Sequence, residues 1–438
     1  RRDASSRFGD NNKWGTFPSF SLGWNIKNES FMQDVPWISG LKLRASWGVN
    51  GNDAIGDFTY AVYTSQNNNY VFGSPATSEQ ITGGTKPSGL ANPNVKWEES
   101  RQTDIGIDMA FFGNRLTFVA DWYHKKTAGM LLSMPVPGYS GDSAPTGNLG
   151  DMLNQGIELD LGYRNSAGDF NYHASINATY NKNTLTYLGD DAPSLYCSNH
   201  QTGQLTRGLV GLPFPYFYGF KSDGIFQNMD EVKAYTNAEG NMIMPNAEPG
   251  DVRFVDIDGD GVIGDGDKTY IGKGIPDWVF GLNLGFDWKG LDFSILLQGQ
   301  LGAQAYNVSR RIDLGAVNLP KYMLNRWTGE GTTNKYPKFE VGDATNYVVS
   351  DVWVEDASFL RARNVQLGYT LPQNITKKFF VQRLRVYAQA ENLFTLTRYQ
   401  GCDPEVTGGN SSYGTEVGID RGVYPQSRTF SVGVNLTF

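Results

Sequence analysis

The stretch Leu41-Lys-Leu-Arg-Ala-Ser-Trp-Gly-Val49 alternates apolar and polar side chains residue by residue. Successive side chains of a β-strand point to opposite faces of a sheet, so such a segment has one apolar and one polar face. The apolar set is Leu41, Leu43, Ala45, Trp47 and Val49, and the polar set is Lys42, Arg44, Ser46 and Gly48. This stretch therefore predicts a β-strand with two chemically different faces.

The same period-2 pattern recurs along the whole chain and predicts an all-β fold of about eleven strands. Within 356–371 the apolar parity changes from Leu360 and Ala362 to Val365, which predicts a β-bulge near Arg363–Asn364. The expected strands span residues 15–27, 40–51, 98–111, 115–126, 153–164, 169–183, 277–288, 291–305, 356–371, 383–397 and 426–438.

The connections between these strands alternate between short and long. Short turns are expected at 112–115, 164–169 and 287–290, and long polar loops at 52–97, 127–152, 186–276, 306–355 and 398–425. Short turns at one rim and long loops at the other are typical of outer-membrane barrels, with the long loops outside the cell. The polar faces carry more Asp, Glu, Asn and Lys than a narrow barrel could bury, which favours a wide lumen. The pattern predicts a transmembrane antiparallel β-barrel in a bacterial outer membrane.

An open sheet in lipid would leave two unpaired edges, and each unsatisfied backbone group costs several kcal/mol. We therefore expect these residues to be one part of a larger barrel, with the chain beginning inside a longer protein.

Composition excludes several other classes. The formal net charge of −8 and the lack of a basic stripe exclude nucleic acid as a partner. Three histidines and two separated cysteines, Cys197 and Cys402, provide no zinc-ligand spacing. A disulfide between the two cysteines and two free thiols are both open. No run of apolar residues is long enough for a transmembrane helix, and the first residues do not have the pattern of a signal peptide.

Several motifs carry a resemblance to a known family. They are Trp14-Gly-Thr-Phe-Pro-Ser19, Leu41–Asn52, Asn154-Gln-Gly-Ile-Glu158, Trp353–Asn364, Glu391-Asn-Leu-Phe394, Tyr399–Glu405 and Tyr424–Phe438. In combination, over essentially all 438 residues, the chain resembles the C-terminal half of SusC/RagA-type transporters, the TonB-dependent importers of the Bacteroidota.

The resemblance implies a 22-stranded barrel in which this chain supplies the second half, while the N-terminal plug domain is absent from it. It also implies active import of glycans or oligopeptides, energised by TonB through the missing N-terminal part. A SusD-like surface lipoprotein would cover the extracellular loops as a lid. The residues that bind substrate stay unknown.

The sharpest local motif is the aspartate-rich segment 256–267. Counted from Asp256, acidic side chains fall at the first, third, fifth and twelfth positions, with glycine at the sixth, a spacing that wraps a loop around a hard cation. Asp at the last position, instead of the usual Glu, could close the site less firmly. We expect Ca²⁺ rather than Mg²⁺, and the alternative is a solvated acidic turn. The candidate ligands are Asp256, Asp258, Asp260, Val262 (through its carbonyl), Asp265 and Asp267.

The C-terminal strand ends on Phe438, with Phe430 on the same face. Together they are predicted to form the signal read by the barrel-assembly machinery. The alternative is a last strand whose outward residues happen to be aromatic.

Signatures of catalysis are missing from the sequence. It contains no G-x-S-x-G, Walker A, G-x-G-x-x-G or H-E-x-x-H motif, so no catalytic residue is predicted and we expect no enzyme. The alternatives to an importer are a passive porin-like barrel and a calcium-containing β-rich surface enzyme. Alternation and rim asymmetry favour a barrel over the enzyme, and only the family resemblance favours an importer over a porin.

Overall fold

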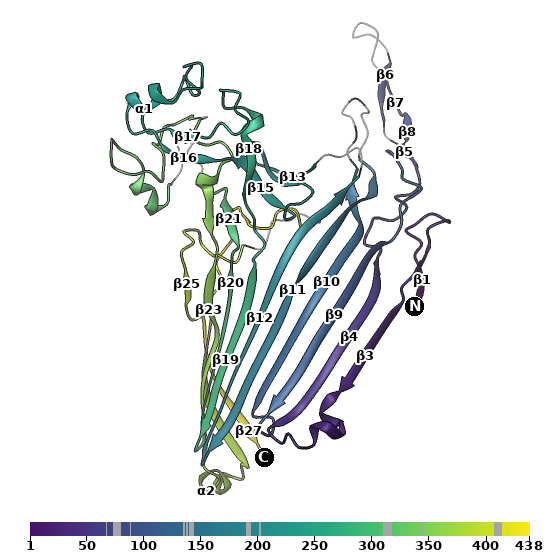
Figure 1. Ribbon diagram of the computed structural model, residues 1–438, viewed down its shortest axis with the longest axis vertical. Coiled ribbons are helices and arrows are strands. Elements are labelled where there is room, and N and C mark those ends of the chain that lie inside the picture. Colours follow the sequence, from purple (N-terminus) through teal and green to yellow (C-terminus); the bar gives the residue numbers. More distant parts are fainter. Residues whose placement is uncertain are drawn as a thin grey trace.

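A large antiparallel sheet organises the computed structural model, which describes residues 1–438 except 67, 73–79, 88, 135, 137–138, 140–143, 190–193, 201–202, 310–317, 344 and 407–413. Eleven strands follow one another as neighbours, and β25 (Thr395–Thr397) pairs beside them with β23. The sheet is tilted and curved like a section of a barrel wall (Figure 1). Its strands are β3 (Ser19–Asn25), β4 (Ile38–Asn52), β9 (Glu98–Phe111), β10 (Leu116–Ser133), β11 (Thr146–Ala167), β12 (Phe170–Leu188), β19 (Trp278–Trp288), β20 (Leu291–Leu301), β23 (Phe359–Thr370), β24 (Arg383–Glu391) and β27 (Thr429–Thr437).

The register of this sheet lines up apolar residues on one face. Ile105 on β9 pairs with Trp122 on β10, which pairs with Ile157 on β11. These large side chains are exposed, Ile105 at 53% and, towards the sheet edges, Leu22 at 75% and Val432 at 81%. A continuous apolar surface of this kind is unfavourable in water, and it fits the lipid-facing side of a membrane barrel.

The predicted strand set is confirmed, with one strand of the wall in each expected segment. The expected strand 383–397 is too long, because β24 ends at Glu391 and β25 is a separate strand. The predicted bulge is confirmed too. Leu297 pairs with Ala362 and Leu296 with Asn364, so Arg363 is the extra residue.

The expected loop 127–152 is wrong in its bounds, because β10 continues to Ser133 and β11 begins at Thr146. Gly129 adopts a φ of +65°, and the register shifts between Thr127 and Met130. Beyond that irregularity three successive residues, Met130, Leu131 and Leu132, are all buried. The end of β10 therefore lacks the period-2 pattern that predicts a strand from sequence.

The two ends of the wall differ in their connections. At one end, β9–β10, β11–β12 and β19–β20 are joined by 112–115, 168–169 and 289–290. The same end holds short helices, η1 (Ile26–Asn28) and η2 (Ser30–Met32) between β3 and β4, and α2 (Gln373–Thr376) and η7 (Lys377–Phe379) between β23 and β24. The long connections gather at the opposite end (Figure 1). This asymmetry matches the outer-membrane plan.

The long connections fold into a layer above the wall (Figure 1), whereas the sequence predicted polar loops. This loop layer has its own apolar cores, one around Phe217 and Trp353 and another around Phe226 and Val252. Its regular elements are β13 (Leu195–His200), β14 (Gly203–Gly208), β15 (Tyr216–Phe220), β16 (Ser222–Ile225), α1 (Met229–Ala234), β17 (Val252–Phe254), η4 (Asp265–Asp267), β18 (Lys268–Gly272), β21 (Gln304–Asn307), η5 (Lys321–Asn325), η6 (Asp351–Trp353), β22 (Val354–Asp356) and β26 (Ile419–Asp420).

Three smaller hairpins lie near the first strands of the wall. β1 (Arg2–Ala4) pairs with β2 (Trp14–Thr16), β5 (Thr64–Gln66) with β8 (Thr85–Pro87), and β6 (Tyr70–Phe72) with β7 (Gln80–Thr82). Among the described residues, helices are all too short or too polar to cross a membrane.

Candidate functional site

The face of the wall opposite the apolar band carries paired charges. Arg44 on β4 lies between two carboxylates on neighbouring strands, with Nη2 2.7 Å from Asp108 and 3.0 Å from Asp121. The Nε of Arg44 donates a further bond of 2.9 Å to Asp108. Charged side chains in contact with lipid would lose their hydration at a high free-energy cost. Three such side chains on one face of the wall therefore indicate that this face borders an aqueous lumen.

A second charged cluster lies at the other end of the sheet. Arg385 on β24 forms an ion pair with Asp292 on β20, across the intervening strand β23. Gln366 on β23 joins the cluster by accepting a 2.8 Å hydrogen bond from Arg385. The lumenal face is therefore polar from the first strands of the wall to the last.

A buried ion-pair network ties the last long connection to the wall. Arg361 on β23 is 2% exposed and donates to Asp403 at 2.6 Å. Arg363, the bulge residue, binds Glu405 at 2.6 Å, and Arg361 reaches the same carboxylate at 3.0 Å. We call these four residues the loop anchor. Because they join two segments about forty residues apart, they fix the part of the last long connection around Asp403 and Glu405 against the wall.

Two opposing effects act on the pKa of the Asp403 carboxyl in this anchor. Burial raises its pKa, but the N–H groups of Gln426 and Glu405 and the guanidinium of Arg361 outweigh burial and hold the pKa below its ordinary value. Asp403 is therefore ionised at neutral pH, as its pairing with Arg361 requires.

The aspartate-rich segment follows β17 in the loop layer. Carboxylate oxygens of Asp256, Asp258 and Asp260 lie within 4.8 Å of one another. Asp256 accepts hydrogen bonds from the N–H groups of Gly259 at 2.7 Å and Gly261 at 2.9 Å. Gly261 has a φ of +84°, the left-handed conformation that glycine adopts without strain. The fold thus gathers three of the predicted ligands around one turn.

The remaining predicted ligands have other partners. Asp267 is fully buried, and its oxygens accept hydrogen bonds from the N–H groups of Ile257 at 2.6 Å and Gly264 at 2.7 Å. Asp265 points into solvent and pairs with Lys268 at 2.7 Å, a hydrogen bond that lowers the pKa of Asp265. Val262 is exposed. Asp267 therefore holds the loop backbone together, and the calcium assignment stays a prediction.

The predicted assembly signal and the cysteines have clear positions. Phe430 and Phe438 are exposed at 68% and 77%, and Phe430 lies on β27, which is an edge strand of the described sheet. The role in assembly stays a prediction. Cys197 and Cys402 are free thiols, and burial raises the pKa of Cys197 to about 12, so it is an unreactive thiol at neutral pH.

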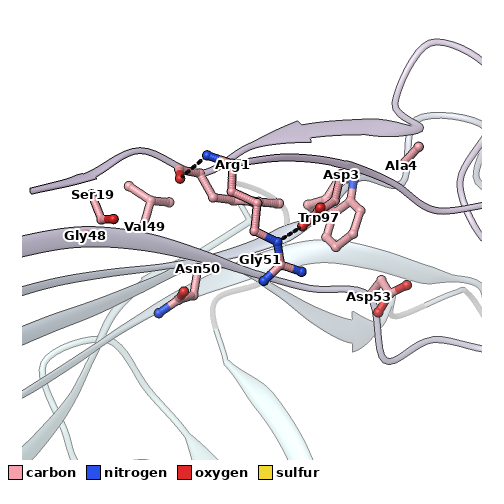
Figure 2. Close-up of a pocket in the computed structure, with 11 residues that line it drawn as sticks. Arg1, Asp3, Ala4, Ser19, Gly48, Val49, Asn50, Gly51, Asp53 and Trp97 are labelled. Carbon is pink, nitrogen blue, oxygen red and sulfur yellow. Dashed lines mark hydrogen bonds and ion pairs between the residues drawn. The ribbon is translucent and has the colours of Figure 1, made fainter.

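A pocket of about 560 Å³ lies at the first edge of the wall, between the β1–β2 hairpin and β4 (Figure 2). Arg1 pairs with Asp3 there, and the amino group of Arg1 donates to the carbonyl of Phe17 at 3.2 Å. Trp97 closes one side. The carboxylate of Asp53, which also lines the pocket, accepts a hydrogen bond of 2.7 Å from the hydroxyl of Ser5.

An exposed apolar band, a charged opposite face and unequal rims define the wall of an outer-membrane β-barrel. The family model of the TonB-dependent receptor-like β-barrel matches residues 1–393. The chain belongs to that family and lies in the bacterial outer membrane.

Similar proteins agree with this assignment. TonB-dependent receptor P3 of Formosa agariphila is 34% identical over 447 residues, covering 100% of this chain and 43% of that receptor. TonB-dependent receptor SusC of Bacteroides thetaiotaomicron is 33% identical over 455 residues, covering 100% of this chain and 41% of SusC.

The solved structure of the RagAB peptide transporter matches with a TM-score of 0.80 and 28% identity, over 100% of this chain and 45% of that one. The predicted resemblance to SusC and RagA is thereby confirmed. The chain spans less than half the length of these relatives, which agrees with the expectation of about half a barrel.

Sequence reasoning missed the loop anchor as a functional unit. Its residues lie in two segments that were quoted only as family motifs, 353–364 and 399–405. The available signal was the spacing itself, because Arg361 and Arg363 stand two apart, as do Asp403 and Glu405. Two arginines and two carboxylates with the same spacing can form paired ion bridges if the two segments lie side by side. The sequence does not show that these segments meet.

Proposed function

We propose that this chain forms part of an outer-membrane importer that takes up an oligomeric nutrient, a glycan or an oligopeptide, using energy delivered through TonB. The two-faced wall supports a membrane barrel, because Ile105, Trp122 and Ile157 face outward while Arg44, Asp108 and Asp121 face inward. The observation that carries import, and favours it over a passive porin, is the match to the TonB-dependent receptor family. The family supports import over catalysis, since the relatives are named receptors and a transporter.

The proposed partners follow from the same family. TonB would act through a plug domain that lies outside this chain, and a SusD-like surface lipoprotein would cover the loop layer. The loop layer supports this part of the proposal, because it has its own apolar cores and can present a defined surface. A firm surface allows docking without the entropy cost of ordering loops at each binding event.

We also propose that Asp256, Asp258 and Asp260 hold Ca²⁺ in the loop layer, with the carbonyl of Val262 completing the turn. Three carboxylates close to one another repel unless a cation or protons neutralise them. Asp267 supports the site by fixing the loop backbone. Ca²⁺ would then rigidify the part of the loop layer that follows β17.

The main competitor is a passive porin, and uptake separates the two. Cells expressing the full-length protein would be tested for growth on, or uptake of, glycan and peptide mixtures, with and without functional TonB. We expect uptake of one class that stops when TonB is removed. Uptake of small solutes that continues without TonB would establish a porin. Intact masses of the protein purified in mild detergent would show whether a lipoprotein accompanies it.

A further inference from the structure

An apolar pocket of about 380 Å³ opens on the lumenal side of the wall, at the end where the loop layer begins. Its wall residues come from β10 and β11, where Met130, Leu131 and Leu132 are at most 8% exposed and Met152 is half-buried. Met152 lies five residues from the outward-facing Ile157, so an odd number of steps places it on the lumenal face. The pocket thus borders the lumen at its mouth.

Two long connections complete this pocket from above. The connection between β12 and β19 contributes Phe214, Pro215 and Ile275, and the one between β24 and β27 contributes Val417. Phe214 and Pro215 are buried, whereas Ile275 and Val417 are half-buried at the rim. The larger part of the lining is therefore aliphatic, aromatic and thioether, with methionines that can adapt to different apolar shapes.

The polar groups of the pocket are occupied by the protein itself. Glu98 accepts hydrogen bonds from the N–H of Leu131 and from the amide of Asn52, each at 3.1 Å. Asn183 accepts the N–H of Phe214 at 2.7 Å and donates to Asn154 at 2.9 Å. Because these polar groups already have hydrogen-bond partners, the pocket offers a ligand mainly apolar contacts. Such contacts suit a hydrocarbon side chain better than a sugar ring that carries hydroxyl groups.

The lumenal wall beyond the pocket has an acidic balance. Glu158 and Asp160 are exposed on the lumenal face of β11, and they have no basic partner among the residues that the structure describes. Asp104 on β9 is bound by the neutral side chains of Ser46 and Gln102 and lies near Lys42 and Arg44. Across β4, β9, β10 and β11 the lumenal side chains of this region carry five carboxylates, including Asp108 and Asp121, against the three cations Lys42, Arg44 and Lys125. The excess of negative charge attracts cationic groups and repels acidic ones.

We propose that this pocket binds an apolar side chain of an oligopeptide, so that the imported nutrient is peptide rather than glycan. This inference rests on the proposed import function and names its substrate class. A peptide presents hydrocarbon side chains together with amino and guanidinium groups, and the pocket and the acidic wall match both. Neutral glycans lack the apolar group, and acidic glycans are repelled by Glu158 and Asp160.

The test uses the full-length protein, purified from membranes with any accompanying lipoprotein. Two synthetic peptides of equal length, identical except for a central Leu or Ser, and a neutral malto-oligosaccharide would be titrated by calorimetry. We expect the Leu peptide to bind about tenfold tighter than the Ser peptide, as burial of one aliphatic side chain predicts. Ile275→Asn and Val417→Asn should bring that ratio close to one, while Ile275→Leu should keep it.

Val341→Asn provides a matched control, because Val341 is 63% exposed in the loop layer and does not line the pocket. The ratio should stay unchanged in this variant. Equal binding of the two peptides, or a ratio that survives in both pocket variants, overturns the assignment. Binding and TonB-dependent uptake of the malto-oligosaccharide alone would also overturn it and leave the import function standing. Loss of TonB dependence for every probe would defeat import itself.

Discussion

The wall and the loop layer use apolar side chains in opposite ways. In the wall, Ile105 and Val432 point outward and are exposed over half or more of their surface. In the loop layer, Phe217 and Trp353 are almost completely buried in a core that forms within the connections. Lipid is the solvent for the first region and water for the second, so one chain satisfies two different folding rules.

The largest effect is expected where the two regions are joined. Asp403→Ala would leave the buried Arg361 guanidinium with one carboxylate fewer, at a local cost of about 3–5 kcal/mol. Hydrogen exchange of segment 398–425 should then accelerate while the wall stays protected. Glu99→Ala, which removes the partner of the exposed Arg101, should change little. Unchanged exchange of that segment in Asp403→Ala would show that the anchor does not hold it.

The next effect tests which solvent each face of the wall meets. Ile157→Arg should destabilise the protein in phospholipid vesicles by about 2–4 kcal/mol, because a charge would then face lipid. Glu158→Arg, on the next residue and the other face, should cost much less. Urea titrations of the folded barrel would measure both. Equal losses in the two variants would mean that the faces are assigned wrongly.

A smaller effect is expected at the aspartate-rich turn. If Ca²⁺ binds there, a concentration a hundred times its Kd stabilises the local fold by about 2.7 kcal/mol. Chelation should therefore increase protease cleavage in 221–276 but not in the wall. The double variant Asp258→Asn and Asp260→Asn should be cleaved at the same rate with and without chelator. Asp230→Asn on α1 is the control and should keep the calcium dependence. Identical cleavage of the unaltered protein in both conditions would refute the calcium site.

The smallest effect is a pH dependence of the anchor. The pKa of Asp403 is lowered in the fold, so the unfolded carboxyl binds protons more readily and the stabilisation is complete above the ordinary carboxyl pKa of about 4. As pH falls through the lowered pKa, this stabilisation is lost. Hydrogen exchange of 398–425, corrected for intrinsic rates, should be constant near neutrality and rise only below about pH 4. Asp403→Asn should flatten that rise, and a rise of equal size in this variant would assign it to another group.

The wall could be predicted from sequence and most of the loop layer could not. Period-2 alternation is set by strand geometry, so it marked every wall strand and even the bulge at Arg363. The loop layer is built from short strands such as β16 and β17, which are too brief to show a period. The core around Phe217 and Trp353 depends on contacts between distant segments.

The candidate sites divide in the same way. The turn at Asp256, Asp258 and Asp260 was visible because all its residues are close in sequence. The apolar pocket was invisible, since Met130, Phe214 and Val417 come from three separate connections or strands. The role of Asp267 was also missed, because a carboxylate at that spacing can bind either a cation or backbone N–H groups.

The bulge on β23 has a consequence for exchanging parts between relatives. By placing Arg363 out of register, it lets two arginines of one strand reach the Asp403–Glu405 pair of another segment. A chimaera that transplants 398–425 without residues 361–363 would carry two carboxylates with no cation to meet them. The unit of exchange is therefore the loop together with three residues of the wall.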